Sequence, residues 1–231
     1  MHMNLKQWGL KPLALLGAIT LAITAMAIVN GQPATTFRVA HLSPNAPAVD
    51  VYVDGVLYEQ GMTFGQIGAT HAPGKSGEML VEVRLAGTAP TTAPVISAVV
   101  NLRPGWRYVL QVSNYLEYLQ IAAMPIHIQT IPAAMGRLEV IHAFPGAPRI
   151  DVVNQYSETV INDLGYLEDP PMVDALSGPY RILVYEETPE RHLYYDQTIS
   201  LEEGANHTLI ITGPPLRTLW LTTRQETLSG P

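Results

Sequence analysis

The chain of 231 residues contains no cysteine, which excludes disulfide bonds, thiolate metal sites and cysteine nucleophiles. Charged residues are scarce, at 14% of the chain against about 25% in typical soluble proteins. The 13 Lys+Arg are outnumbered by 20 Asp+Glu and form no basic cluster, so nucleic acid is not expected as a partner. The apolar fraction of 47% is large enough for a folded core and excludes intrinsic disorder.

Catalytic and ligand-binding motifs are also missing. The sequence has no G-x-S-x-G elbow, no S-x-x-K, no glycine-rich phosphate loop, no H-E-x-x-H and no Asp-rich calcium loop. We therefore expect no enzyme activity, no cofactor and no metal. One enzymatic alternative stays open, an extracellular hydrolase that uses the paired carboxylates Glu168-Asp169, Glu186-Glu187 and Glu202-Glu203.

The N-terminus carries one long apolar run, Pro12 to Val29, preceded by Lys6 and Lys11. As a helix, 18 residues rise about 27 Å, close to the thickness of a bilayer core. Positive charge on its N-terminal side alone places that end in the cytoplasm and residues 38–231 outside. The sequence therefore predicts an exported protein in which residues 1–36 form a signal or membrane-anchor segment.

Two fates of this segment remain open. As a single-pass anchor it is longer than the usual signal-peptide core, and Ala14, Ala18 and Ala22 form a small-residue face that could pack on another membrane helix. As a signal peptide it would be cleaved near Ala27, after the small-x-small pattern Ala25-Met26-Ala27, and the protein would be secreted.

The remainder of the chain contains an internal duplication. Two ten-residue segments share His, Pro, Ala, Pro and Asp at an offset of 101 residues. The duplication divides the chain into repeat one at 37–126, a linker at 127–136 and repeat two at 137–231. Because the linker is too short to be a free tether, we expect the repeats to touch. The shared positions are His41, Pro44, Ala46, Pro47 and Asp50, and His142, Pro145, Ala147, Pro148 and Asp151.

Each repeat has the pattern of a β domain. Residues 49–53 alternate and end in Asp54-Gly55, a strong signal for a two-residue hairpin turn. Pro104-Gly105 likewise predicts a type II turn. Six or seven short strands in about 90 residues predict an all-β fold of two tandem Ig-like β-sandwiches.

The opening of repeat one resembles a bacterial family designated domain of unknown function 4397. The residues that carry the resemblance are the run His41 to Gly55, then Phe64-Gly65 and Glu82-Val83-Arg84. Repeat two keeps the His/Pro/Ala/Pro/Asp frame but has Val153-Asn154-Gln155 in place of the Tyr-Val-Asp-Gly turn. The resemblance implies exported tandem β-sandwich modules and carries over no catalytic residue.

The His/Asp pair of each repeat is the sharpest polar feature. His41 with Asp50, and His142 with Asp151, could form an acid–base pair or half of a metal site, but no further ligands are spaced to complete one. We expect these residues, with Pro44, Pro47, Pro145 and Pro148, to form a structural motif, because a duplicated fold keeps its scaffold.

Charge is divided unequally, with −1 in repeat one and −8 in repeat two. Two interpretations remain open: repeat two is solvent-exposed while repeat one is partly buried against partners or lipid headgroups, or the acidity only keeps an exported domain soluble. Separately, we expect the long connections 64–75 and 156–178 to carry contacts, because loops carry function on such scaffolds. Together these features predict a non-enzymatic cell-surface protein whose modules bind protein partners in adhesion or a structural role. The alternative is a single-span accessory subunit of a larger membrane complex, with its sandwiches docked on partner domains.

Overall fold

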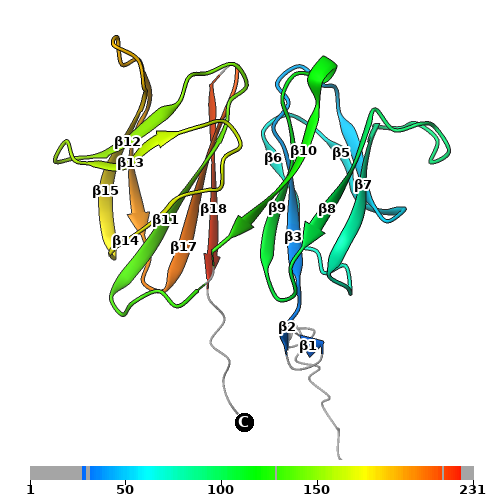
Figure 1. Cartoon of the computed structure of the whole chain (residues 1–231), viewed down its shortest axis with the longest axis horizontal. Helices are drawn as coiled ribbons and strands as arrows, with labels where there is room; N and C mark the ends of the chain where they lie inside the picture. The colour runs from blue at the N-terminus through cyan, green and yellow to red at the C-terminus, as the bar shows by residue number, and fades with distance from the viewer. Residues whose placement is uncertain (1–27, 30–31, 128, 215, 225–231) are drawn as a thin grey trace, which may run out of the picture.

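The computed structural model describes residues 28–29, 32–127, 129–214 and 216–224, and its regular structure is almost entirely β (Figure 1). In these ranges the only helical element is a 3-10 turn at Leu116–Tyr118, and no helix is long and apolar enough to cross a membrane. The all-β class predicted from the sequence is confirmed.

Most of the predicted N-terminal helix lies outside the described residues, including the packing face Ala14, Ala18 and Ala22 and the cleavage site near Ala27. The last two residues of the apolar run are described, and they are not helical. Ile28–Val29 form strand β1, which pairs with β2 at Gln32–Pro33.

The first module consists of eight strands in two four-stranded sheets. One sheet has the order β10-β9-β3-β6, in which the central strands β3 and β9 run parallel. The other has the order β5-β4-β7-β8 and is antiparallel throughout. The strands are β3 (Thr36–His41), β4 (Val49–Val53), β5 (Val56–Met62), β6 (Gln66–Ile67), β7 (Gly77–Leu85), β8 (Ile96–Leu102), β9 (Arg107–Ser113) and β10 (Gln120–Ile126).

The second module repeats this arrangement strand for strand. Its sheets have the orders β14-β11-β17-β18 and β13-β12-β15-β16, with β11 and β17 parallel. The strands are β11 (Met135–Ala143), β12 (Ile150–Asn154), β13 (Thr159–Leu164), β14 (Met172–Leu176), β15 (Gly178–Glu186), β16 (Leu193–Leu201), β17 (Ala205–Thr212) and β18 (Arg217–Arg224).

The connectivity differs from the predicted Ig-like one. In an immunoglobulin domain the second strand lies between the first and the fifth. In the first module the second strand is β4, and it lies between the third strand, β5, and the fifth, β7. The first strand of the module, β3, pairs with the seventh, β9. The sequence pattern locates strands but does not fix their partners, because period-2 alternation is the same in every antiparallel pairing.

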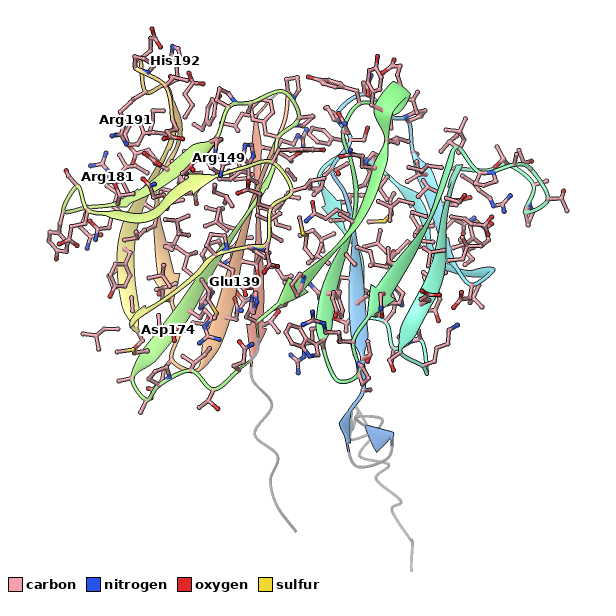
Figure 2. All side chains as sticks on the ribbon, viewed as in Figure 1. Glu139, Arg149, Asp174, Arg181, Arg191 and His192 are labelled. Atoms are coloured by element: carbon pink, nitrogen blue, oxygen red, sulfur yellow. The ribbon has the colours of Figure 1, made fainter. Side chains whose placement is uncertain are left out.

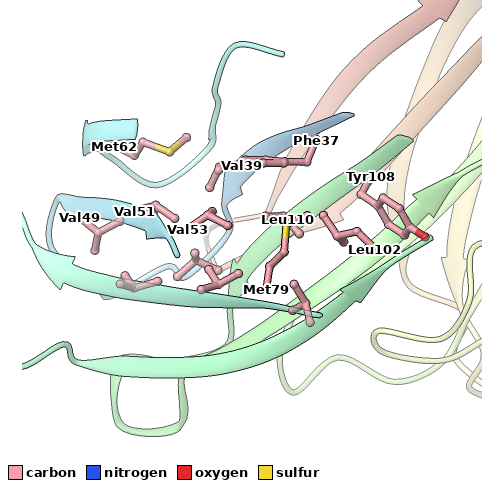
Figure 3. Packing of buried hydrophobic residues seen from close by; sticks show 14 residues of the cluster. Phe37, Val39, Val49, Val51, Val53, Met62, Met79, Leu102, Tyr108 and Leu110 are labelled. Carbon is pink, nitrogen blue, oxygen red and sulfur yellow. The ribbon is translucent and has the colours of Figure 1, made fainter. Parts of the chain in front are cut away.

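Each module encloses its own apolar core between its two sheets. In the first module, alternate residues of β4 (Val49, Val51 and Val53) point inward and pack with Met79 and Leu110 (Figure 3). The predicted hairpin turn is confirmed by positive φ at both central residues, 49° at Asp54 and 78° at Gly55. Alternation and turn chemistry therefore act together to fix which face of each strand is buried.

A third apolar core joins the modules. It packs the outward faces of β3, β9 and β10 against those of β11, β17 and β18. The β3 and β17 sheets are therefore covered on both faces, and the chain forms four stacked sheets (Figure 1). The predicted contact between the repeats is confirmed. The buried members are Ala40, Leu42, Val109, Met124, Ile126, Ile141, Ala143, Ile210 and Leu221.

Polar contacts cross the same boundary. The Thr212 hydroxyl lies 3.1 Å from the carbonyl oxygens of both Leu42 and Ala143, so one buried side chain bonds to both modules. The Tyr166 hydroxyl of the second module lies 3.4 Å from the Ser113 hydroxyl of the first. Such contacts fix the register of the two sheets as well as their separation.

Candidate functional site

The two histidines of the duplicated frame occupy equivalent positions at the ends of β3 and β11. His41 Nε2 lies 3.2 Å from the carbonyl oxygen of Pro47, and His142 Nε2 lies 2.9 Å from that of Pro148. Both rings are buried, and burial lowers the pKa of each imidazole. Each histidine therefore clamps the proline-rich crossing from one sheet to the other as a neutral ring.

The two aspartates of the frame accept hydrogen bonds from backbone amides and, in the part of the chain that the structure describes, make none with the histidines. Asp50 accepts hydrogen bonds from the amides of Gly61, at 2.7 Å, and Gly87, at 3.3 Å. Asp151 accepts the amide of Asp163 at 3.0 Å and lies 3.4 Å from the Arg191 guanidinium. Within the described residues no hydrogen bond joins either histidine to the aspartate of its own repeat, so the structure does not bring them together as an acid–base pair.

The prolines of the frame line the crossings that the histidines clamp. Pro47 and Pro148 supply the accepting carbonyls, and Pro44 and Pro145 lie just after the ends of β3 and β11. No group of three or more metal-ligating side chains occurs in the described ranges.

Close to Asp151, the second module carries a group of ionised side chains. The sequence named Glu168 and Glu187 among the paired carboxylates but did not predict that they gather with Arg149 and Asp163. The Arg149 guanidinium binds the Asp163 carboxylate and, at 2.8 Å, the Glu168 carboxylate. Arg149 thereby lowers the pKa of Glu168. The Glu187 carboxyl hydrogen-bonds Asp163, which lowers the pKa of Asp163 and raises that of Glu187.

A second group lies beside it, at the tip of the β15–β16 hairpin. The Glu186 carboxylate accepts hydrogen bonds from the Tyr194 hydroxyl at 2.5 Å and the Thr188 hydroxyl at 2.8 Å, and pairs with His192 at 2.7 Å. These hydrogen bonds, with that of Tyr194 the largest, lower the pKa of Glu186 to about 2. Burial and the same contact raise the pKa of Tyr194 to about 12, and Glu186 raises the pKa of His192.

We call these side chains the charged end of the second module. Figure 2 shows Arg149, Arg191 and His192 toward the end of the molecule opposite β1 and β2. The residues come from four separate segments of sequence, so the paired-carboxylate pattern marks Glu168, Glu186 and Glu187 but no local motif marks the whole group. The charged end consists of Arg149, Asp163, Glu168, Glu186, Glu187, Arg191 and His192.

The first module has the same scaffold without these charges. The amide of Gly61 binds Asp50 as the amide of Asp163 binds Asp151, and the amide of Ala86 binds the Ala48 carbonyl as that of Glu187 binds the Arg149 carbonyl. Arg149, Asp163, Glu186 and Glu187 thus correspond to Ala48, Gly61, Leu85 and Ala86. The fold itself does not require charge at these four positions.

The outward faces of the outermost sheets also differ. On the first module, Leu80 lies opposite Val99 across β7 and β8, and both side chains are exposed. At the equivalent pair of the second module, Arg181 lies opposite Thr198. Arg181 binds the neighbouring Asp196 at 2.7 Å, so this face is polar. This exposed apolar pair of the first module is therefore absent at the equivalent positions of the second.

Comparison with known proteins identifies the family. The model for "Domain of unknown function (DUF4397)" matches residues 35–153, just over half of the chain. The chain belongs to this family. The DUF4397 match covers the whole first module and extends into β12 of the second, which confirms the resemblance drawn from the His41 to Gly55 segment.

Beyond DUF4397, the comparisons carry little weight. No curated protein sequence matches the chain. The Bacillus anthracis TIE protein is similar over 77% of this chain, at 12% identity and a TM-score of 0.25, and the chain spans 33% of its length. A Bacteroides uniformis protein provisionally assigned to cell adhesion is similar over 83% of this chain and 99% of its own, at 9% identity and a TM-score of 0.27. TM-scores this low support no conclusion about this chain.

Proposed function

We propose that this DUF4397 protein is a non-enzymatic, exported cell-surface protein that binds a protein partner through the charged end of the second module. The observation that supports this is the divergence of two copies of one scaffold. The four positions that are Ala48, Gly61, Leu85 and Ala86 in the first module are charged in the second, around an Asp that both modules share. Because the fold tolerates uncharged residues there, the requirements of the fold alone do not account for these charges.

The chemistry of the charged end fits contact rather than catalysis. Its carboxylates are hydrogen-bonded by arginine, tyrosine or threonine, so they are preorganised acceptors on an exposed hairpin and loop. Acidic side chains outnumber basic ones there, which favours a partner with a basic surface. If the N-terminal segment anchors the chain, this end points away from the membrane, since β1 and β2 lie at the opposite end (Figure 1).

The test replaces residues of the second module by their counterparts in the first. Full-length protein carrying Arg149→Ala, Asp163→Gly, Glu186→Leu and Glu187→Ala is expressed in the native cells, and surface cross-linking is compared with wild type. We expect the cross-linked partner to be lost while circular dichroism shows an unchanged β fold. Retention of the same cross-links would overturn the proposal.

One observation favours the alternative, an accessory subunit docked on a larger membrane complex. The exposed Leu80 and Val99 form an apolar pair whose equivalent positions in the second module are polar. Leu80→Arg with Val99→Thr, again counterparts from the second module, serves as the matched variant. If it removes the cross-links and the charged-end variant does not, the first module is the docking surface and the accessory-subunit hypothesis is supported.

Export and anchoring are tested by the intact mass of the protein from the membrane fraction of its native cells. A mass for residues 1–231 supports a retained anchor. A mass lacking about 27 residues, as expected from the small-residue cleavage rule, supports secretion.

A further inference from the structure

The two modules fill the space between their sheets differently at one end. In the first module three rings meet there. The centroids of Phe37 and Tyr58 are 5.1 Å apart, those of Tyr58 and His71 are 5.1 Å apart, and those of Phe37 and His71 are 5.6 Å apart. Phe37 is fully buried (Figure 3), so these rings close this end of the sandwich.

Strand pairing identifies the counterparts of these rings in the second module. Phe37 is paired with His71, and at the equivalent place Leu138 is paired with Val173. Tyr58 is the residue after Leu57, which pairs with Tyr52. At the equivalent place in the second module, Val160 is the residue after Thr159, which pairs with Val153. Each aromatic ring of the first module is thus replaced by a smaller aliphatic side chain: Leu138, Val160 and Val173.

A cavity of about 70 Å³ occupies the space that the rings would fill, and it is partly open to solvent. Its lining is almost wholly apolar: Leu138, Val160, Val173 and Ala175 are joined by Ile182, Ile199 and Leu201, with the sides of Asn154 and Tyr180.

The two polar residues of the lining have their hydrogen bonds elsewhere. The Asn154 side chain bonds to the amides of Tyr156 and Glu158 and to the Glu158 carboxylate. The Tyr180 hydroxyl donates to the Leu176 carbonyl oxygen at 2.8 Å. The pocket therefore offers a ligand no unsatisfied polar group, and burial of hydrocarbon is the interaction it can make.

We propose that this pocket binds the end of an unbranched aliphatic chain. Its volume is about half of the roughly 150 Å³ apolar cavity that accepts benzene, so it suits the last few carbons of an alkyl chain better than a ring. The opening lets the remainder of the chain and a polar head stay in water. This site is separate from the charged end, so it does not depend on the proposed function.

The experiment titrates full-length protein, in mild detergent that lacks a linear alkyl chain, with ethanol, 1-propanol and 1-butanol. Binding is followed by methyl NMR of Leu138, Val160, Val173, Ile182 and Ile199. We expect saturable shifts confined to these methyl groups, with an affinity that rises about fourfold for each added carbon until the pocket is filled. Benzyl alcohol, which carries a ring, is expected to leave them unchanged.

The matched variants introduce the aromatic residues of the first module at the equivalent positions of the second. Leu138→Phe with Val160→Tyr, or Val160→Tyr alone if the double variant does not fold, should abolish the shifts. Tyr58→Val in the first module is the control and should leave them intact. The proposal is overturned if the wild-type protein shows no saturable shift, or if the shifts persist in the folded Val160→Tyr variant.

Two further probes distinguish the source of the chain. Hexanoate represents a free fatty acid, and monomeric dihexanoylphosphatidylcholine represents a membrane lipid. Saturable shifts with either one support the proposal and name the source, and the absence of shifts with both contradicts it.

Discussion

His41 and His142 show how one residue type serves the same structural purpose in both modules. Each ring is buried at the end of a strand and bonds to the carbonyl oxygen of a proline six residues later. A protonated imidazole is poorly solvated in such a place, which is why burial lowers the pKa. The histidines therefore couple the stability of the fold to pH.

We predict that stability falls as the pH drops below about 6.5, the ordinary histidine pKa. With the folded-state pKa lowered, the unfolded chain binds the proton more readily, so acid favours unfolding, and the stabilisation is complete only above that pH. Urea midpoints at about pH 7.5 and about pH 5.5 measure the fall. His41→Gln with His142→Gln keeps an amide donor for each proline carbonyl and should reduce the dependence.

His192 is the internal reference for this measurement. Its pKa is raised by Glu186, so it stabilises the fold at low pH and loses that effect as the pH rises through its folded value. His192 is present in both the wild type and the double variant, so its contribution cancels when the pH dependence of stability is compared between them. An equal pH dependence in the two proteins would show that His41 and His142 do not couple stability to pH.

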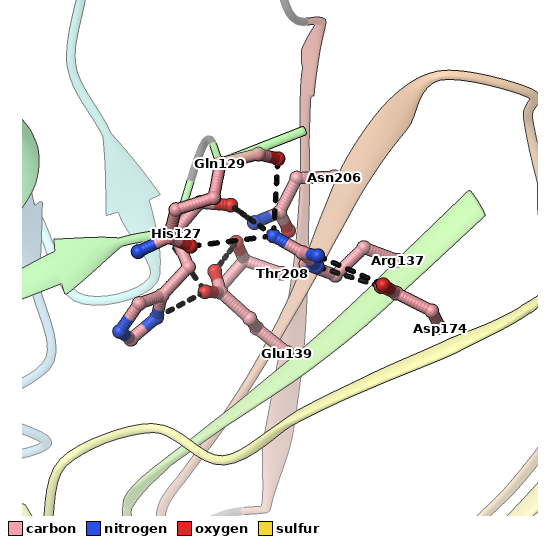
Figure 4. A network of polar contacts seen from close by, with 7 residues as sticks. All are labelled: His127, Gln129, Arg137, Glu139, Asp174, Asn206 and Thr208. Carbon is pink, nitrogen blue, oxygen red and sulfur yellow. Dashed lines mark hydrogen bonds and ion pairs between the residues drawn. The ribbon is translucent and has the colours of Figure 1, made fainter. Parts of the chain in front are cut away.

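At the scale of elements, the segment between the modules is held to β11 by a buried carboxylate. Glu139 is fully buried and accepts the His127 amide at 2.8 Å, with its Oε1 2.6 Å from His127 Nδ1 (Figure 4). Arg137 binds Asp174 at 2.7 Å and also reaches the carbonyl oxygens of His127 and Gln129. The linker is therefore part of the packed structure rather than a hinge.

Glu139→Ala should destabilise the protein by about 1–3 kcal/mol, because it leaves the half-buried donors of His127 without their acceptor. Glu139→Gln retains an oxygen for the His127 amide and should cost less. Urea unfolding measures both. If the free energy of unfolding of the alanine variant falls by less than about 1 kcal/mol, the contact between Glu139 and His127 contributes little to stability.

The sequence predicts the long strands and the tight turns well, and the short edge strands poorly. Residues 49–53 were expected to form a strand and coincide with β4, since their alternation is strong. Strands β6, with two residues, and β14, with five half-exposed or exposed ones, have too little buried face to produce a pattern. The sequence names Glu186 and Glu187 as paired carboxylates but not their grouping with Arg149 and Asp163, because that grouping depends on the pairing of β12, β13 and β15.

At the scale of the whole molecule, the duplicated modules are joined by burial. A strand with both faces covered has a nearly continuous apolar sequence, as in Leu209 to Ile211 of β17, where all three residues are buried. That pattern reports burial but not what covers each face, so the sequence predicted contact between the repeats without predicting that the β3 and β11 sheets face each other. The core between them nevertheless makes the molecule mechanically one unit.

One cooperative unfolding transition is therefore expected for the wild-type chain in calorimetry. Ile141 is fully buried between the modules, and Ile141→Asp would place an unpaired charge there. Separating the modules relieves that charge while leaving each internal core intact, so the variant should unfold in two transitions. Ile141→Val removes only one methylene, at a cost of about 0.5–1.5 kcal/mol, and should keep a single transition. A single transition in the aspartate variant would mean that the contact between the sheets is not what makes unfolding cooperative.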